Sequence, residues 1–234
     1  TVLIKKIVVY EDVVQIKAEV KRATFSNEIT SKQEIDFEVF HSNIDLQNAI
    51  DEINIVIQQN DNWQTIKKNI KPTFIKKNSL EYNYDKEINF MGGNEFRDFN
   101  ISSLRFFSKN IDTIYITKNS THNAPIYSVR LKQDQNRSHK PYFEKYDLNG
   151  KLIIQKDNCY SPENESEYVM VKFNLEKKEL NEHEKIYIFG SLSNWNINSK
   201  FLLKYNHESK NFEKEVLLKQ GYYNYQYVTK KENE

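Results

Sequence analysis

The sequence predicts an all-β protein built from tandem immunoglobulin-like β-sandwich domains. Apolar and polar residues alternate with a period of two in many short segments, which is typical of half-buried strands. Polar turns separate these segments by about 8–12 residues, a spacing that favours a sandwich over alternating strands and helices. The last third adds a strand that ends in Gly190-Ser-Leu-Ser-Asn-Trp195 and another that begins Gly221-Tyr-Tyr-Asn-Tyr. This layout is typical of a small immunoglobulin-like sandwich.

The first elements all show strand-like patterns. Residues 1–10 form a β-branched apolar run, which we interpret as the closing strand of a preceding domain outside this sequence. Val14–Lys21 alternates cleanly and predicts a half-buried strand, with Val14, Ile16, Ala18 and Val20 on its inner face. Glu34–Phe40 and Ile53–Gln59 repeat the pattern. The segment Asn43–Asp51 between them is too short for more than a helical turn.

Seven further strands complete the first predicted domain, which spans residues 11–157. They lie at Thr73–Ile75, Ser79–Tyr84, Ile101–Phe107, Thr113–Thr117, Ile126–Leu131, Tyr142–Asp147 and Lys151–Gln155. Asn149-Gly150 joins the last two and predicts a hairpin, because tight type I′ turns require positive φ at both central residues.

A linker at residues 158–165 is predicted to end this domain. The stretch around it has no apolar period and contains Pro162. A second, smaller immunoglobulin-like sandwich is expected at residues 166–234. Its strands are predicted at Tyr168–Leu175, Lys185–Phe189, Lys200–Tyr205, Phe212–Leu218 and Tyr222–Thr229.

The composition argues against several classes of partner. The 34 basic and 33 acidic residues nearly cancel, so neither a nucleic acid nor an anionic membrane is an expected partner. No apolar run approaches the roughly 18 residues that span a bilayer, so direct membrane insertion is not expected either. The 15 tyrosines and 14 phenylalanines predict a folded core despite the polar average. A single cysteine, Cys159, excludes an internal disulfide.

The sequence offers no recognisable catalytic, metal or cofactor site. Gly92-Gly93 is not followed by the Lys-Ser/Thr of a phosphate-binding loop, and Gly190-Ser-Leu-Ser lacks the second glycine of a nucleophile elbow. The five histidines are far apart, and Glu182-His183-Glu184 is interpreted as a charged turn. We therefore predict a protein that is not an enzyme and that has no catalytic, cofactor-binding or metal-binding residues.

Two residues are candidate surface contacts, Trp195 and Tyr222. An exposed Trp195 could stack on a sugar ring, because the segment resembles the turn of glycogen-binding modules. Such modules usually present a second aromatic platform residue, and the other tryptophan, Trp63, lies in the other predicted domain. The alternative is that Trp195 folds back over the end of the sandwich as a lid on its core.

The tyrosine-rich segment near the C-terminus is predicted to form a strand with one buried face. Tyr223, Tyr225 and Tyr227 fall on one side of a strand and are expected in the core, which leaves Tyr222 as the contact candidate. The segment Met91–Phe106 is expected to be a structured crossover between sheets. Its two arginines are expected to form a buried polar bracket.

A series of short blocks resembles the plug protein of the type 9 secretion system. The most specific are Gly93-Asn-Glu-Phe-Arg-Asp-Phe99 and Leu217-Leu-Lys-Gln-Gly-Tyr-Tyr-Asn-Tyr-Gln-Tyr227. Supporting blocks occur in the same order from about residue 10 onward, at Ala18–Thr24, Gln33–Phe37, Ser103–Arg105, Lys140–Tyr142, Asp147–Gly150 and Tyr187–Leu192.

This resemblance implies a periplasmic protein of Bacteroidota, associated with the outer membrane and built of tandem immunoglobulin-like sandwiches. Members of the family close the periplasmic mouth of a large outer-membrane β-barrel translocon, so that barrel is the implied partner. The competing hypothesis is a carbohydrate-binding module for α-glucans, anchored on Trp195.

Overall fold

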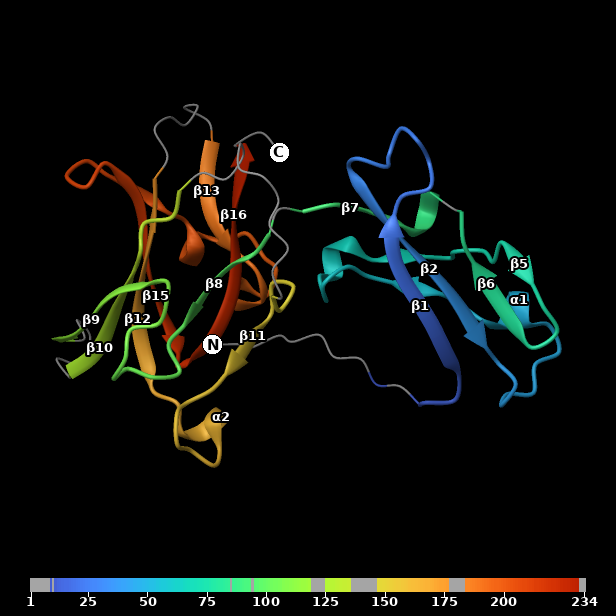
Figure 1. Cartoon of the computed structure of the whole chain (residues 1–234), viewed down its shortest axis with the longest axis horizontal. Helices are drawn as coiled ribbons and strands as arrows, with labels where there is room; N and C mark the ends of the chain where they lie inside the picture. Colours follow the sequence, from blue (N-terminus) through green and yellow to red (C-terminus); the bar gives the residue numbers. More distant parts are fainter. Residues whose placement is uncertain are drawn as a thin grey trace. The chain divides into compact units, whose positions relative to one another are not determined.

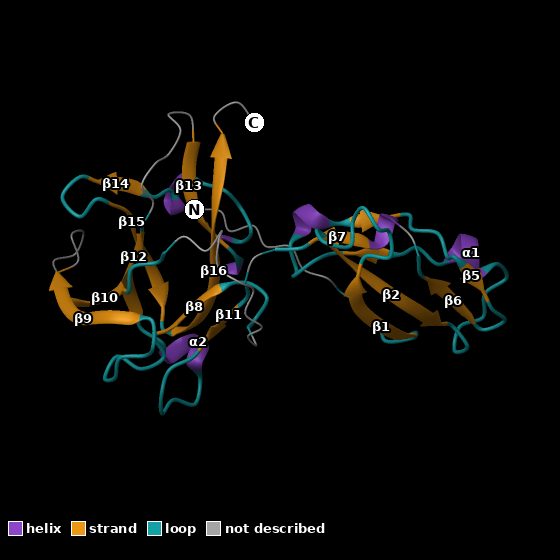
Figure 2. Ribbon diagram, turned by 45° about the horizontal axis from the view of Figure 1, so that its top comes forward, coloured by secondary structure: helices purple, strands orange, loops and turns teal. Residues whose placement is uncertain are grey.

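The computed structural model describes residues 9, 11–84, 86–93, 95–118, 125–135, 147–176 and 184–231. The chain divides into two compact units, and the division falls after Gly93. Strands account for most of the regular structure in both units (Figures 1 and 2), which confirms the all-β fold class. Among the described residues, no helix has the length and apolar character needed to cross a bilayer.

The first unit is organised around one antiparallel five-stranded sheet. The strand order is β1-β2-β6-β5, and β7 pairs with the other end of β2. A separate two-stranded ribbon, β3 with β4, follows the first helix. The elements are β1 (Gln15–Arg22), β2 (Lys32–Phe40), α1 (Ala49–Glu52), β3 (Val56–Ile57), η1 (Trp63–Thr65), β4 (Lys67–Lys68), β5 (Phe74–Ile75), β6 (Ser79–Tyr82), η2 (Lys86–Ile88) and β7 (Asn89–Met91).

The core of the first unit lies on one face of this sheet. Phe37 on β2 and Tyr82 on β6 stack with ring centroids 4.5 Å apart. Segments outside the sheet supply the facing residues, notably Ile55 and Ile70, which are buried in the same cluster. The alternation predicted for Glu34–Phe40 is confirmed, since Phe37 and Val39 are both buried.

Strand β1 forms as predicted, but its expected burial is wrong. Ile16 and Val20 are 62% and 63% exposed, and Ala18 is exposed as well. Only Val14, just before the strand, packs against the core cluster. Alternation in the sequence indicates that one face of a strand is apolar, but it does not show whether another layer of the protein covers that face.

The second unit is a sandwich of two sheets, shown as two facing layers in Figure 1. One sheet has the order β14-β15-β12-β10-β9, and the other has β11-β16-β13 with β8 also paired to β16. All of the described strand pairs in these two sheets are antiparallel except β10 with β12, which is parallel. The elements are β8 (Arg97–Asn100), β9 (Ile111–Lys118), β10 (Pro125–Leu131), β11 (Leu152–Ile154), α2 (Pro162–Glu165), β12 (Tyr168–Leu175), β13 (Glu184–Phe189), η3 (Ser191–Ser193), η4 (Ser199–Phe201), β14 (Lys204–Asn206), β15 (Asn211–Lys219) and β16 (Gly221–Lys231).

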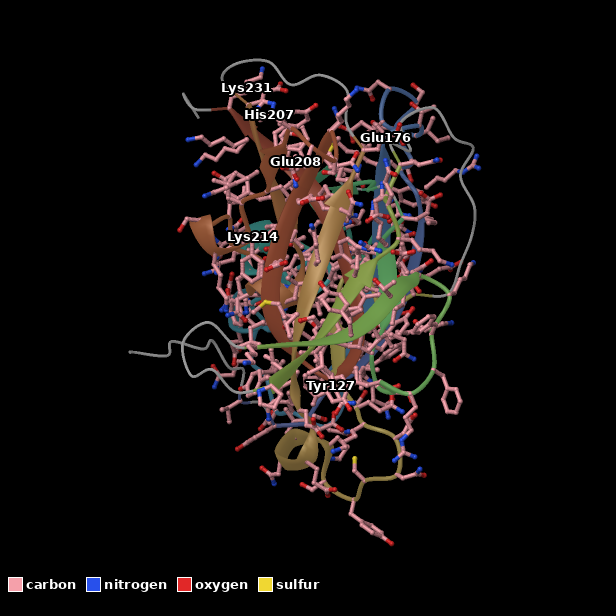
Figure 3. All side chains as sticks on the ribbon, turned by 90° about the vertical axis from the view of Figure 1, so that its left-hand side faces the viewer. Tyr127, Glu176, His207, Glu208, Lys214 and Lys231 are labelled. Atoms are coloured by element: carbon pink, nitrogen blue, oxygen red, sulfur yellow. The ribbon has the colours of Figure 1, made fainter. Side chains whose placement is uncertain are left out.

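Aromatic contacts join the two sheets of the second unit. Phe99 on β8 stacks on Tyr223 of β16 at 5.0 Å and meets Phe173 of β12 edge-on at 5.6 Å. Tyr225 also meets Phe173 edge-on at 5.1 Å. Burial of Tyr223 and Tyr225 at 1% and 2% exposure confirms the predicted inner face of this strand. Figure 3 looks onto the β9-β10-β12-β15 layer, with Tyr127 on β10.

The predicted domain boundary at residues 158–165 is wrong. Strands on either side of it belong to the same sheets, because β8 and β11 pair with β16 and β10 pairs with β12. The stretch around Pro162 is a surface loop within the second unit that contains α2. The polar composition that suggested a linker is equally typical of a loop between strands.

Two other predicted strands differ from the structure. The stretch Ile101–Phe107 is a loop, and the strand lies just before it as β8. Lys200–Tyr205 begins with the short helix η4 and becomes β14 only at Lys204. The predicted strands at residues 1–10 and 142–147 and the cluster at residues 182–184 fall wholly or largely outside the described residues.

Candidate interaction surface

Trp195 follows β13 and the short helix η3 in the second unit, and it is only 9% exposed. Its ring meets Phe189 edge-on at 5.4 Å and Phe96 at 6.2 Å. Its backbone N–H donates to the Gly190 carbonyl at 3.0 Å, which turns the side chain back over the sheet. The sugar-platform interpretation of Trp195 as a surface contact is therefore wrong, and the lid interpretation is confirmed.

The absence of a side chain at Gly150 leaves space for the Trp195 ring. A Cβ atom at Gly150 would lie 2.3 Å from Trp195 Cη2 and 2.6 Å from Phe96 Cε1. Gly150 follows Asn149 in the predicted Asn-Gly turn, with φ values of 81° and 50°. The Gly150 carbonyl accepts from the Ser191 N–H at 2.8 Å, which ties this turn to the Trp195 segment. The sequence thus predicted the turn, and its second function is to admit the indole.

Asp134 forms the centre of a largely buried cluster of hydrogen-bonded side chains in the same unit. We call this cluster, which contains Asp134, Arg97, Tyr225 and Tyr227, the bracket. One carboxylate oxygen accepts from Arg97 Nη1 at 2.7 Å. The other accepts from the hydroxyls of Tyr225 and Tyr227 at 2.6 and 2.9 Å. The predicted bracket is thus present with Arg97, whereas Arg105 is exposed. Sequence reasoning missed Asp134, which has no local signal.

The bracket holds its tyrosines in the neutral form. Burial is the main cause that raises the pKa of Tyr225 and of Tyr227 well above the ordinary value. The Asp134 carboxylate adds to both pKa shifts, because a second negative charge beside it is unfavourable. Burial raises the pKa of Tyr223 as well. These hydroxyls are hydrogen-bond donors at neutral pH and are not poised as bases.

These raised pKa values predict alkaline unfolding of the second unit. Unfolded tyrosines ionise near pH 10, whereas the folded unit keeps these three neutral above that pH. The stabilisation is therefore complete below about pH 10 and is lost as pH rises toward the folded pKa values. We expect the free energy of unfolding to fall above about pH 10, less steeply in Tyr225→Phe. Denaturation series at several alkaline pH values measure this slope, and equal slopes in the two proteins would contradict it.

Tyr222 lies on the opposite side of β16 from this bracket and is half-buried. Its strand neighbours are Ile153 on β11 and Asn100 on β8. Burial is the main cause that raises its pKa, and the Asp98 carboxylate adds to the shift. Tyr222 is thus a partly covered residue of the sheet face, and it makes a poor anchor for a partner.

Among the described residues of the second unit, the most exposed aromatic side chains lie on two loops. Phe106 and Phe107, between β8 and β9, are 73% and 63% exposed, and Tyr160, in the loop before α2, is completely exposed. The Asp157 N–H donates to the Ser102 carbonyl at 3.2 Å, which joins the two loops. Figure 1 shows both loops at the same end of the sandwich, beside α2. We call Phe106, Phe107 and Tyr160 the aromatic end.

Sequence reasoning assigned the two phenylalanines to a strand and so missed this surface. The signal that could have revealed it is their adjacency. Neighbouring residues of a strand point to opposite faces, so Phe106 and Phe107 cannot both face one core. The polar turn Ser108-Lys109-Asn110 that follows them also marks a loop.

Within the described ranges, no group of three or more histidine, cysteine, aspartate or glutamate side chains could hold a metal ion. His41 and His207 lie in different units, and the other three histidines fall outside those ranges. Cys159 is half-buried and donates to the Lys156 carbonyl.

The two most specific sequence blocks meet in space. Residues Arg97–Asn100 pair with Tyr222–Tyr225, so the end of the first block lies in β8 and most of the second block lies in β16 beside it. Phe99 stacks on Tyr223 across this pair. The side chains of these two blocks therefore pack in the core of the second unit. The aromatic end is formed by other residues.

Comparison with known proteins finds similarity to solved structures and to no described family. No protein-family model matches it, and no curated protein is significantly similar in sequence. A similar structure is the crystal structure of a hypothetical protein from Parabacteroides merdae ATCC 43184, with a TM-score of 0.75 and 30% identity. The match covers 94% of this chain and 53% of that one, so the chain spans about half the length of the protein it resembles. The similarity supports the all-β fold over nearly the whole sequence described above.

Proposed function

We propose that the chain is a non-enzymatic docking protein that plugs the periplasmic end of the type 9 secretion translocon. In this proposal it acts in the periplasm, associated with the outer membrane, and its partner is the translocon β-barrel. The observation that carries the proposal is the aromatic end, where three aromatic side chains of the second unit are exposed to solvent.

Exposed aromatic side chains are costly to leave in water and are typical anchors of protein interfaces. Phe106 and Phe107 are adjacent, and the loop that carries them is held by hydrogen bonds to the frame. Ser108 Oγ donates to the Asn100 carbonyl at 2.8 Å, and Gln220 Nε2 donates to the Ser102 carbonyl at 3.0 Å. A loop fixed in this way loses little conformational freedom on binding, which favours a specific contact.

Two further observations support the proposal. The blocks that resemble the plug family include paired residues of β8 and β16, which contribute Phe99, Tyr223 and Tyr225 to the core of the second unit. The ionisable groups of the buried bracket are engaged with one another: Arg97 and the two tyrosines satisfy Asp134. Such a cluster of mutually bonded groups stabilises a fold.

Purification from native outer membranes tests the proposal. We expect the tagged chain to recover a large β-barrel protein, and Phe106→Ser/Phe107→Ser to reduce the recovered barrel by about tenfold or more, as the loss of a hot spot would. The matched control is Phe74→Ser/Ile75→Ser, which removes two exposed apolar side chains from the first unit and should leave recovery unchanged. Recovery of no barrel, with and without secreted cargo, would make us abandon the proposal.

A further inference from the structure

The edge strand β1 of the first unit presents a bare continuation of the core face. In the β1–β2 register, Ile16 lies opposite Val39 and Ala18 opposite Phe37. Paired residues point to the same side of a sheet. Val39 and Phe37 are buried at 2% and 6% exposure, whereas Ile16 is 62% exposed. The same apolar face is therefore covered over β2 and open over β1.

The outer edge of β1 is also open within the described part of the chain. β1 stands at the end of the strand order and pairs only with β2 there. The pairing with β2 runs unbroken over eight residue pairs, from Gln15 to Arg22, without a bulge or a proline. A long, regular edge strand with exposed apolar residues is a template for another strand.

We propose that β1 pairs in antiparallel fashion with β1 of a second copy of this chain, centred on Ala18. The strand sequence Gln-Ile-Lys-Ala-Glu-Val-Lys-Arg complements itself in that register. Ile16 faces Val20 of the partner subunit, and Ala18 faces its own counterpart. On the opposite face, Lys17 meets Glu19 of the partner subunit, and the two-fold axis repeats each contact.

The charges select this register over its neighbours. Moving the centre by one residue places Lys17 opposite Lys17 or Glu19 opposite Glu19, which is unfavourable between strands. If the centre lies between two residues instead, the apolar residues of one strand lie opposite the charged residues of the other, and the two apolar faces point to opposite sides. Only the register centred on Ala18 keeps both Lys–Glu pairs and all three apolar pairs. Lys17 and Glu19 are exposed and available for these contacts.

Charge reversal tests the self-pairing directly. We expect the 234-residue chain to show a concentration-dependent monomer–dimer equilibrium in sedimentation velocity. Lys17→Glu and Glu19→Lys should each weaken the dimer by about tenfold or more, because each creates two like-charge pairs. An equimolar mixture of these two variants should form a mixed dimer, because glutamates then oppose lysines at both positions. Lys118→Glu, on edge strand β9 of the second unit, is the matched control and should leave the dimer unchanged.

A chain that stays monomeric at all accessible concentrations would overturn the inference, whether its edge is capped by its own residues or by another protein. A dimer that ignores both reversals, or one that the mixture fails to restore, would equally overturn it. The inference is independent of the proposed plug function, because it concerns the first unit and needs no barrel.

Discussion

Replacing Trp195 with alanine is expected to lower the free energy of unfolding of the second unit by roughly 3–5 kcal/mol, the usual cost of truncating a buried tryptophan. The indole is 9% exposed and lies between Phe96 and Phe189. Because Gly150 has no side chain at the same place, nothing nearby fills the cavity. The surrounding turn is held by backbone hydrogen bonds and is expected to relax only in part.

Denaturant unfolding followed by far-ultraviolet circular dichroism measures this loss. The matched control is Tyr160→Ala, which removes a fully exposed aromatic ring of the same unit and should change stability by less than about 0.5 kcal/mol. If Trp195→Ala cost no more than this control, the prediction that the indole stabilises the core of the second unit would be wrong.

Replacing Asp134 with alanine is expected to cost about 3 kcal/mol, because it leaves Arg97 and two tyrosine hydroxyls without their shared acceptor. The side chains of Arg97 and Asp134 are only 13% and 17% exposed. Water therefore replaces the lost carboxylate poorly. The Arg97 guanidinium also lies over the Tyr227 ring at 5.4 Å, and its position there depends on Asp134.

The comparison variant is Asp112→Ala. Asp112 binds Arg130 at the same 2.7 Å distance, but both side chains are nearly half exposed. Exposed ion pairs contribute at most about 1 kcal/mol, so the two aspartate variants should differ clearly in the midpoint of denaturation. Equal midpoints would show that the buried bracket contributes no more than a surface ion pair.

Local patterns were sufficient to predict most strands and one face of the core. Tyr223 and Tyr225 were placed inside by alternation alone, and the structure buries both. The Asn149-Gly150 turn was also readable, because few other residue pairs adopt positive φ twice in succession. These features depend on neighbours in sequence, which a single chain displays directly.

Long-range pairing could not be predicted in the same way. β8 and β16 lie at opposite ends of the second unit's sequence, yet they pair directly. The composition near Gly93 is no more typical of a linker than the polar stretch around Pro162. The domain boundary was therefore predicted near Pro162 and not after Gly93. Asp134 was missed for the same reason, since its partners come from β8 and β16.

The exposure of strand residues was the second feature that the sequence could not predict. Ile16 on β1 and Val39 on β2 belong to equally regular alternating segments, yet one is exposed and the other buried. The difference depends on whether a further layer lies over the strand, and sequence alternation contains no information about that layer. The aromatic end and the open face of β1 both consist of apolar side chains that the described part of the fold leaves exposed.

The role of the resembling blocks follows from their positions. They contribute to the β8–β16 pair and its aromatic packing, so their side chains stabilise the sandwich and lie outside the proposed docking surface. Sequence similarity in these blocks is therefore compatible with different partners, and the aromatic end is where specificity is expected to reside.

Site-specific photo-crosslinking in native outer membranes tests this account most directly. A photoreactive residue at Phe106 or Tyr160 is expected to crosslink to the translocon barrel, whereas one at Phe74 of the first unit is expected to give no barrel adduct. Crosslinks from Phe74 with none from Phe106 or Tyr160, or no barrel adduct from any position, would contradict the claim that the aromatic end docks onto the translocon.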